Sequence, residues 1–201
     1  ALIAGSPGMT GAAALMALGA LHGGAGLVTV FTHPACVDEV ARRCPPEAMV
    51  RALPASGLQG FPCMDFDVIG LGPGIGRTLD AALPAFVRHC PRPLVIDADA
   101  LNALARQSSV AALADARHAA RVITPHPGEF ARLAPDLTGL PRDRAAAAFV
   151  ARYPGATLLL KGAVSIIAGH GQPIGFNQTD CSGLASGGTS EVLAGLAKTI
   201  L

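Results

Sequence analysis

The chemistry-bearing residues nearest the end of the chain combine backbone amides with one carboxylate. Ser186-Gly-Gly-Thr-Ser190 is a glycine-rich turn, and Glu191 follows it at the start of an apolar helical stretch over 192–201. Free amides at a helix start can hold an anion, while a carboxylate beside them can take the proton of an attacking hydroxyl. This combination suits phosphoryl transfer.

Two further glycine-rich turns are predicted at the ends of strands. Gly5-Ser-Pro-Gly-Met-Thr-Gly11 runs into a helix whose first amides could hold a phosphate, although it lacks the Lys-Ser/Thr pair of a P-loop. Gly70-Leu-Gly-Pro-Gly-Ile-Gly76 has glycines that let backbone approach a ligand closely. An ordinary tight turn explains the second motif equally well.

Several polar residues follow other predicted strands. Asp97 and Asp99 could orient Mg²⁺ or a ligand, and Asp99 could equally cap the next helix. His126 and Glu129 have no second histidine or third carboxylate at matching spacing, so we expect no metal site. His126 lies between two prolines and is expected to contact a ligand. Lys161 ends a predicted strand, and its positive charge suits a position near a nucleotide. A solvated lysine at the strand end is the alternative.

Short apolar runs alternate with alanine-rich helical segments, which predicts an α/β fold with a mainly parallel central sheet and helices on both faces. The expected strands are 1–4, 27–31, 68–71, 94–97, 122–124 and 157–161, followed by a hairpin of 164–168 and 173–176. The expected helices begin near Thr10, Pro34, Thr78, Ala100, Pro127, Arg142 and Gly188. Ligands of such sheets bind beyond the carboxyl ends of the strands.

Composition excludes several classes of protein. The 201 residues suit one domain, and the net charge of +1 with scattered basic residues argues against nucleic-acid binding. Five cysteines without a C-x-x-C pair predict neither a disulfide framework nor structural zinc, and fit a cytoplasmic protein. The uncharged stretch 11–31 could span a bilayer, but the glycines that follow His22 predict a helix, a turn and a buried strand instead.

Taken together, these segments resemble the NAD(P)H-hydrate dehydratase family of the ribokinase-like superfamily. The resemblance covers nearly the whole chain and rests on motifs in register, which are more specific than any one alone. They are Gly5-Ser-x-Gly-Met-Thr-Gly-Ala-Ala13, Gly24-Ala-Gly-Leu-Val-Thr-Val30, Gly72-Pro-Gly-Ile-Gly76, Asp97-Ala-Asp-Ala-Leu-Asn102, Thr124-Pro-His-Pro-Gly-Glu129, Leu160-Lys-Gly-Ala163 and Gly187-Gly-Thr-x-x-Val-Leu-Ala-Gly195.

The resemblance implies one ribokinase-like domain over residues 1–201, lacking short segments at both ends, that repairs hydrated NADH or NADPH. ATP or ADP, with Mg²⁺, would phosphorylate the ring hydroxyl, and phosphate elimination would restore the ring. It implies Glu191 as the catalytic base. It implies substrate contacts at Ala12, Gly74, Gly76, Asn102, His126 and Glu191, and nucleotide contacts at Lys161, Gly162, Ala163, Val164, Ser165, Gly187, Gly188 and Ser190.

The chain departs from the family pattern close to this chemistry. Ser190-Glu191 replaces the usual Gly-Asp, and Asp180-Cys181 replaces Gly-Asn. Glutamate extends the carboxylate by one methylene, about 1.5 Å. Serine adds a Cβ at a turn that could require a positive φ, and Asp180 adds negative charge near the phosphate path. These changes predict weakened turnover.

Two alternatives stay open beside the repair reaction. One is another ribokinase-like kinase that stops at the phosphate ester of a small molecule, and the other is a nucleotide-binding module without turnover. The resemblance also implies a homo-oligomer, a tetramer in the family, and fusion to or association with an epimerase of the hydrate.

Overall fold

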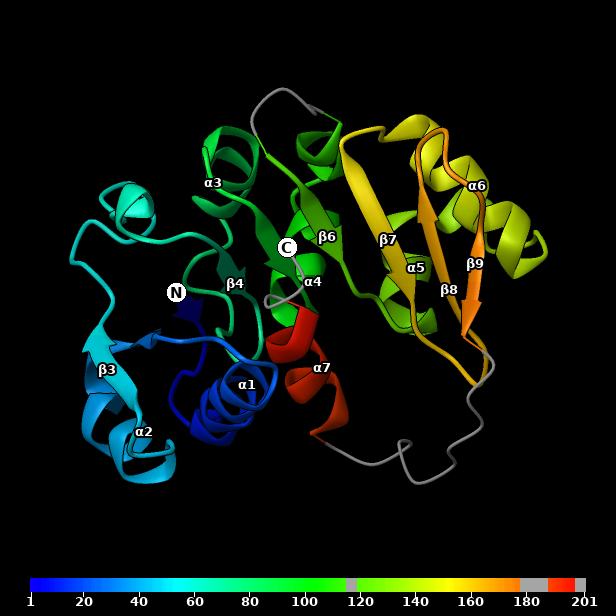
Figure 1. Cartoon of the computed structure of the whole chain (residues 1–201). Helices are drawn as coiled ribbons and strands as arrows, with labels where there is room; N and C mark the ends of the chain where they lie inside the picture. Colours follow the sequence, from blue (N-terminus) through cyan, green and yellow to red (C-terminus); the bar gives the residue numbers. More distant parts are fainter. Residues whose placement is uncertain (115–118, 178–187, 198–201) are drawn as a thin grey trace.

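The computed structural model describes residues 1–114, 119–177 and 188–197, and within them the strands form one sheet (Figure 1). The strand order is β3-β2-β1-β4-β5-β6-β7-β8-β9. Neighbours from β3 to β7 pair in parallel, whereas β7 with β8 and β8 with β9 pair antiparallel. The strand bounds are β1 Leu2–Ile3, β2 Val28–Thr32, β3 Ala48–Ala52, β4 Ile69–Leu71, β5 Leu94–Ile96, β6 Arg121–Ile123, β7 Ala156–Leu160, β8 Ser165–Gly169 and β9 Gly175–Asn177.

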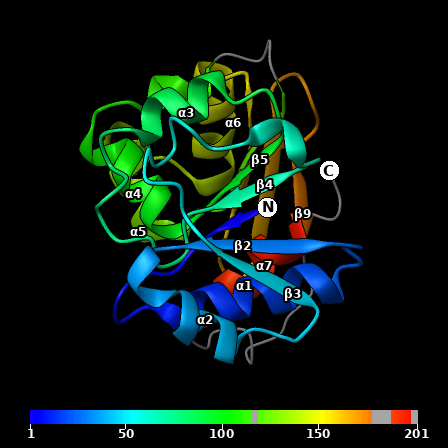
Figure 2. The same cartoon turned by 90° about the vertical axis from the view of Figure 1, so that its left-hand side faces the viewer.

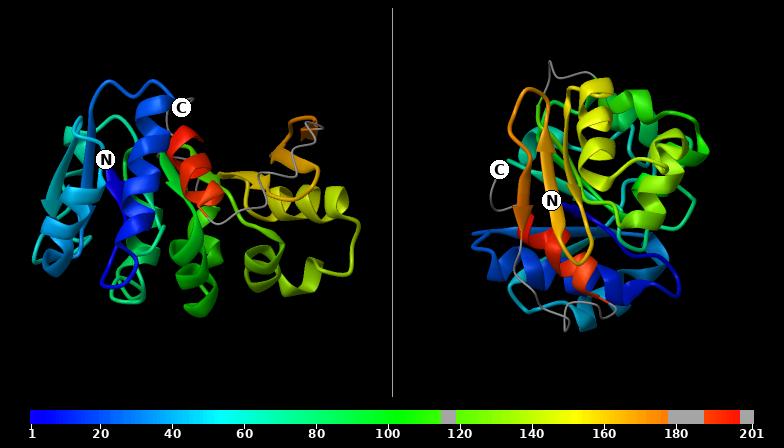
Figure 3. Two further views of the ribbon diagram at one scale, coloured as in Figure 1. Left: turned by 90° about the horizontal axis from the view of Figure 1, so that it is seen from below. Right: turned by 90° about the vertical axis from the view of Figure 1, so that its right-hand side faces the viewer.

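Helices cover both faces of the sheet, as the alternating pattern predicted (Figure 2). Figure 3 shows α1 and α7 together on one face and α3 to α6 on the other. The helix bounds are α1 Thr10–His22, α2 Val37–Arg43, α3 Leu83–His89, α4 Ala98–Arg106, α5 Pro127–Leu133, α6 Arg142–Arg152 and α7 Thr189–Ala197.

Each face of the sheet has its own hydrophobic core. Val95 of β5 packs with residues of α1, α2 and α7, whereas its neighbours Leu94 and Ile96 pack with residues of α3 to α6. Successive side chains of a strand point to opposite faces, so a strand covered on both faces must be apolar throughout. This explains why the predicted strands read as continuous apolar runs.

The uncharged stretch 11–31 forms most of α1 and β2, as expected. None of the described helices is long and apolar enough to cross a membrane. The hairpin near the end of the chain is also confirmed, as β8 and β9.

The elements differ from the expectations in three places. Strand β3 was not foreseen, because it is a short edge strand: only Ala48 and Val50 are half-buried, its other three residues are exposed, and Arg51 interrupts its apolar residues. The helix expected near Thr78 begins at Leu83, after turns over 77–82. A short 3-10 helix, Pro34–Cys36, precedes α2 where one helix was expected at Pro34.

Candidate functional site

Loops from the carboxyl ends of the parallel strands surround a cleft of about 730 Å³. The start of α1, the loop after β4, the start of α4 and the start of α7 all contribute to it. Its lining consists of Gly8, Met9, Thr10, Gly11, Ala12, Leu15, Glu39, Arg43, Gly74, Ala98, Asp99, Gly188 and Glu191. We call this the edge cleft.

Close packing of α7 against α1 fixes Glu191 in the edge cleft. A Cβ on Gly195 of α7 would collide with the Met16 carbonyl of α1, and a Cβ on Gly19 of α1 would collide with the Val192 carbonyl of α7. The two helices therefore touch through their backbones, side by side in Figure 1. Glu191 lies in the first turn of α7, where free amides favour negative charge.

The loop after β4 brings Gly74 against the start of α1. A Cβ on Gly74 would lie 2.9 Å from the Met9 carbonyl oxygen and 3.0 Å from the Ala12 Cβ. The backbone φ of Gly74 is +66°, so a side chain there would be strained even without neighbours. The glycines of this motif thus allow a close backbone approach, and Gly74 and Ala12 form one wall of the cleft.

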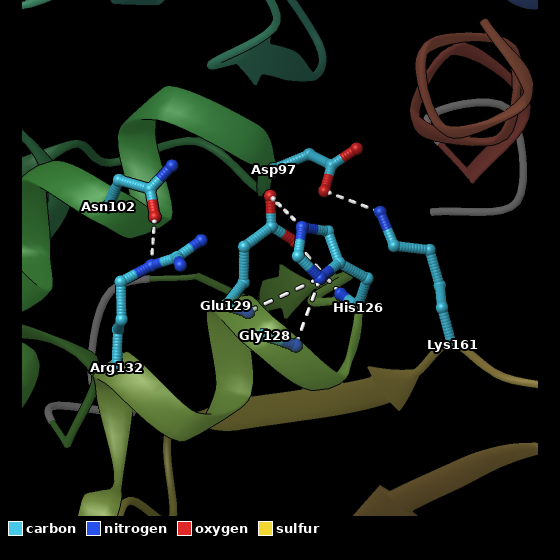
Figure 4. A network of polar contacts seen from close by, with 7 residues as sticks. All are labelled: Asp97, Asn102, His126, Gly128, Glu129, Arg132 and Lys161. Atoms are coloured by element: carbon cyan, nitrogen blue, oxygen red, sulfur yellow. Dashed lines mark hydrogen bonds and ion pairs between the residues drawn. The ribbon is translucent and has the colours of Figure 1, made fainter. Parts of the chain in front are cut away.

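Asp97 directly follows β5 and is fully buried. It pairs with Lys161, which directly follows β7 (Figure 4). Its Oδ1 accepts a hydrogen bond from the Lys161 Nζ at 2.9 Å, and its Oδ2 has no hydrogen-bond partner among the described residues. Burial, together with a smaller effect of the Glu129 charge, raises the pKa of Asp97 to about 6 against the opposing effect of Lys161. The lysine side chain is only 13% exposed, so the alternative of a solvated lysine was wrong.

The residues after Asp97 turn toward the edge cleft. Ala98 has a φ of +50°, a left-handed conformation that is rare for a residue with a Cβ. Asp99 is the second residue of α4 and its Oδ2 accepts a hydrogen bond from the Gly76 amide at 3.0 Å. Asp99 therefore ties α4 to the loop after β4, and the expectation that it caps the helix was wrong.

His126 caps α5, and half of its side chain is exposed. Its Nδ1 accepts hydrogen bonds from the Gly128 and Glu129 amides at 3.0 and 3.3 Å, and the Glu129 Oε2 accepts from the His126 amide at 2.8 Å. The His126 Nε2 lies 3.4 Å from the Glu129 Oε1, so both ring nitrogens have partners, and His126 does not line the edge cleft. Glu129 is buried by the reciprocal cap.

Arg142 at the start of α6 holds the segment after β7. Its guanidinium donates hydrogen bonds to the carbonyls of Leu160, Lys161 and Val164 at 3.2, 3.0 and 2.9 Å. A Cβ on Gly162 would lie 2.5 Å from the Arg142 Nη2, so the guanidinium packs flat against this glycine. Arg142 thereby fixes the backbone over 160–164.

Glu39 and Arg43 of α2 reach the edge cleft from the other side. The Glu39 Oε1 accepts a hydrogen bond from the Thr10 hydroxyl at 2.8 Å and pairs with the Arg43 Nη2 at 3.0 Å. The Thr10 hydrogen bond, aided by Arg43, holds the pKa of Glu39 below its usual value. Neither residue was predicted from the sequence, since an i, i+4 pair on a short helix is an ordinary surface feature.

The structure brings only some of the sequence-predicted site residues together. Ala12, Gly74, Gly188 and Glu191 line the edge cleft, and Gly76 adjoins it through its bond to Asp99. Asn102 lines a second cleft between α4 and α5. Lys161 to Ser165 and His126 lie outside both linings. Gly187, Asp180 and Cys181 lie outside the described residues.

The start of α7 and the arrangement of possible metal ligands bear on two further expectations. Ser190 lies within the first turn of α7, so its backbone is helical and the positive φ considered for it is not required. Gly188 just before the helix has a φ of +94°. Across the described residues, no three His, Cys, Asp or Glu side chains gather as a metal site.

A mainly parallel sheet covered on both faces, with a helix start and glycine-rich loops at its carboxyl edge, defines a protein of the ribokinase-like class. A ribokinase-like superfamily protein from Enterococcus faecalis superposes with a TM-score of 0.83 at 27% identity, covering 98% of this chain and 69% of that one. A family model described as NAD(P)H-hydrate dehydratase matches residues 1–201. The chain belongs to the NAD(P)H-hydrate dehydratase family.

Two relatives show how far this similarity extends. The bifunctional NAD(P)H-hydrate repair enzyme Nnr of Gloeobacter violaceus is 39% identical over 205 residues, which cover 99% of this chain and 39% of the relative. The ADP/ATP-dependent NAD(P)H-hydrate dehydratase from Bacillus subtilis, co-crystallised with ATP/Mg²⁺, has a TM-score of 0.76 at 28% identity over 99% of this chain and 70% of that one. The chain thus spans about two fifths of the Gloeobacter relative.

Proposed function

We propose that this chain dehydrates hydrated NADH or NADPH at the expense of a nucleotide, with Glu191 as the base. The observation that carries the proposal is the position of Glu191 in the first turn of α7, lining one cleft with Ala12 and Gly74. Family membership and the repair enzymes among its relatives support the same reaction.

The residues of the edge cleft fit a two-step reaction. Glu191 takes the proton of the ring hydroxyl while the hydroxyl oxygen bonds to the terminal phosphorus of the nucleotide. The bond from that phosphorus to the rest of the nucleotide breaks, and the shortened nucleotide leaves. The amides at the start of α7 stabilise the charge on the transferring group. The C–O bond of the phosphate ester then breaks, a ring proton leaves, and the ring double bond is restored.

The nucleotide is proposed to contact Lys161, Gly162, Ala163, Val164 and Ser165, together with Gly187, Gly188 and Ser190 before and within α7. The fixed backbone over 160–164 supports this, because Arg142 holds three of its carbonyls and the Lys161 amide is bonded to the Pro125 carbonyl at 2.9 Å. Gly188 lies in the edge cleft beside Glu191, where the nucleotide's terminal phosphate would have to lie.

The substrate is proposed to contact Ala12, Gly74, Gly76, Asn102 and His126 as well as Glu191. Ala12, Gly74 and Glu191 share the edge cleft, and Gly76 adjoins it. Asn102 and His126 lie beyond the lining of the edge cleft, but a ligand as long as a dinucleotide can reach them. Cytoplasmic location, assembly into an oligomer and association with an epimerase stay predictions.

Magnesium fits this site as a partner of the nucleotide. Mg²⁺ usually takes one or two carboxylates and fills its other positions with water and phosphate oxygens. The edge cleft offers the carboxylate of Asp99, which would hold the ion and leave Glu191 as the base. When bound, it neutralises phosphate charge. The ATP/Mg²⁺ complex of the Bacillus subtilis dehydratase supports its inclusion here.

The test is the near-ultraviolet absorbance of the dihydronicotinamide, followed with hydrated NADH or NADPH, Mg²⁺ and either ATP or ADP. We expect a rise that requires a nucleotide and is lost in Glu191→Gln, while that variant still binds nucleotide by calorimetry. Phosphate ester without restored absorbance would instead identify a small-molecule kinase. Nucleotide binding without either product would identify a silent binding module, and would refute the proposal.

A further inference from the structure

A second cleft, of about 560 Å³, lies between α4 and α5 and has an unusually basic lining. Its polar residues are Arg77, Asn102, Arg106 and Arg132. The edge cleft, by contrast, pairs one arginine with three carboxylates, those of Glu39, Asp99 and Glu191. In a chain of net charge +1, a cleft lined by three arginines points to an anionic ligand, because among the described residues only Arg106 is paired with a carboxylate, that of Asp80.

Two of these arginines are held in place by neighbours. Arg106 donates hydrogen bonds from Nε and Nη2 to both carboxylate oxygens of Asp80, each at 2.8 Å. Arg132 donates from its Nε to the Asn102 Oδ1 at 2.8 Å, which leaves its terminal nitrogens for a ligand (Figure 4). Such bonds lower the entropy lost when an arginine binds an anion.

Arg77 is the most available cation of the cleft. It is exposed, and although its backbone carbonyl accepts a hydrogen bond from the Asp80 amide, its guanidinium makes no hydrogen bond or ion pair among the described residues. An arginine can bind a phosphate through two parallel hydrogen bonds, and these charge-assisted bonds are stronger than neutral ones. Arg77 is therefore the residue whose loss should affect an anion most and the fold least.

The second cleft, which we call the arginine cleft, is close to the edge cleft. Arg77 directly follows Gly76, whose amide is bonded to Asp99 in the edge cleft. Asp99 and Asn102 lie one turn apart on α4, and Asp99 and Arg106 are separated by about 10 Å along the helix axis. An extended dinucleotide is longer than this, so one ligand can occupy both clefts.

We propose that the arginine cleft binds the phosphate on the 2′-oxygen of the substrate's adenosine, and thereby favours hydrated NADPH over hydrated NADH. This inference rests on the proposed function, since it places the nicotinamide ring at Glu191 and the adenosine end at Arg77. A phosphate monoester carries close to two negative charges at neutral pH and offers three acceptor oxygens to the arginines.

The experiment compares kcat/KM for the two hydrates in the wild-type protein and in Arg77→Gln. We expect the variant to lose about tenfold or more with hydrated NADPH, the effect of one charge-assisted hydrogen bond, and to keep its value with hydrated NADH. Arg144→Gln, which removes an exposed arginine of α6, is the matched control and should change neither. Equal losses with both hydrates, or no loss with either, would overturn the assignment.

A binding measurement separates this inference from the proposed reaction. Calorimetry with adenosine 2′,5′-bisphosphate and with AMP should show tighter binding of the bisphosphate in the wild-type protein and equal binding in Arg77→Gln. This result is expected even from a protein without turnover, so an inactive protein would refute only the reaction. Inorganic phosphate that binds in an Arg77-dependent manner, without any preference for the bisphosphate, would show a free-phosphate site and refute the inference.

Discussion

Asp97 and Lys161 form an ion pair of 2.9 Å that joins the carboxyl ends of β5 and β7 across the intervening strand β6. The Asp97 side of the pair continues into Ala98 and Asp99 of the edge cleft, and the Lys161 side continues into the proposed nucleotide segment. One buried contact thus fixes the position of the edge cleft relative to the proposed nucleotide segment. Removing it should affect both stability and the alignment of the two ligands.

Stability should depend on pH through Asp97. The pKa of Asp97 is raised by burial from 3.8 to about 6, so between these values the folded protein keeps a proton that the unfolded chain has released. Raising the pH from 4 to 7 should therefore lower the free energy of unfolding, by up to about 3 kcal/mol from this group.

Denaturant unfolding at a series of pH values checks this with Asp97→Asn, which cannot titrate. The free energy of unfolding of the wild type minus that of the variant should fall between pH 4 and pH 7. Asp67→Asn, which replaces an exposed carboxylate, should give a flat difference over the same range. A difference that rises with pH would contradict the pKa direction.

Shortening Glu191 should speed turnover. Aspartate withdraws the carboxylate by about 1.5 Å to the usual family position, and a misplacement near 1 Å can cost about a hundredfold in rate. We expect Glu191→Asp to raise kcat by about tenfold or more with little change in KM. Steady-state kinetics decide it, and a lower kcat would show that the cleft is adapted to glutamate.

Replacing Arg142 should weaken nucleotide binding selectively. Its guanidinium donates to three carbonyls of the segment after β7, and a lysine ammonium cannot reproduce this planar set. Arg142→Lys should raise the KM for nucleotide by about five- to tenfold, and leave the KM for the hydrate unchanged. Arg144→Lys on the same helix is the control, and a shift in the hydrate KM alone would assign Arg142 elsewhere.

Filling the contact between α1 and α7 should destabilise the protein. A Cβ on Gly195 would collide with the Met16 carbonyl and lie 2.7 Å from the Ala20 amide nitrogen, so the helices must separate. Gly195→Ala should cost about 1–3 kcal/mol of unfolding free energy. Gly139→Ala, where the added Cβ meets nothing, should change it little. Equal unfolding curves for the two variants would show that α7 is not packed as described.

Much of the fold could be predicted from local sequence. Buried parallel strands must be apolar on both sides, so runs such as Leu94–Ile96 were evident without a structure. Glycine turns and proline-started helices such as α5 also carry strong local signals. Strand β3 was missed because its pairing at the sheet edge depends on β2, which its own residues do not reveal.

The sequence by itself determined the α/β class, and it predicted the carboxyl edge as the place of the candidate site with Glu191 and the glycine turns in its lining. Only the tertiary structure decided that Glu191 shares a cleft with Ala12 and Gly74, that Asp97 holds Lys161, and that three arginines share a second cleft. The physical reason is that glycine conformations, caps and apolar periodicity act over a few neighbouring residues. Side chains far apart in the chain meet only through strand order and helix packing, as Asp97 and Lys161 do over 64 positions.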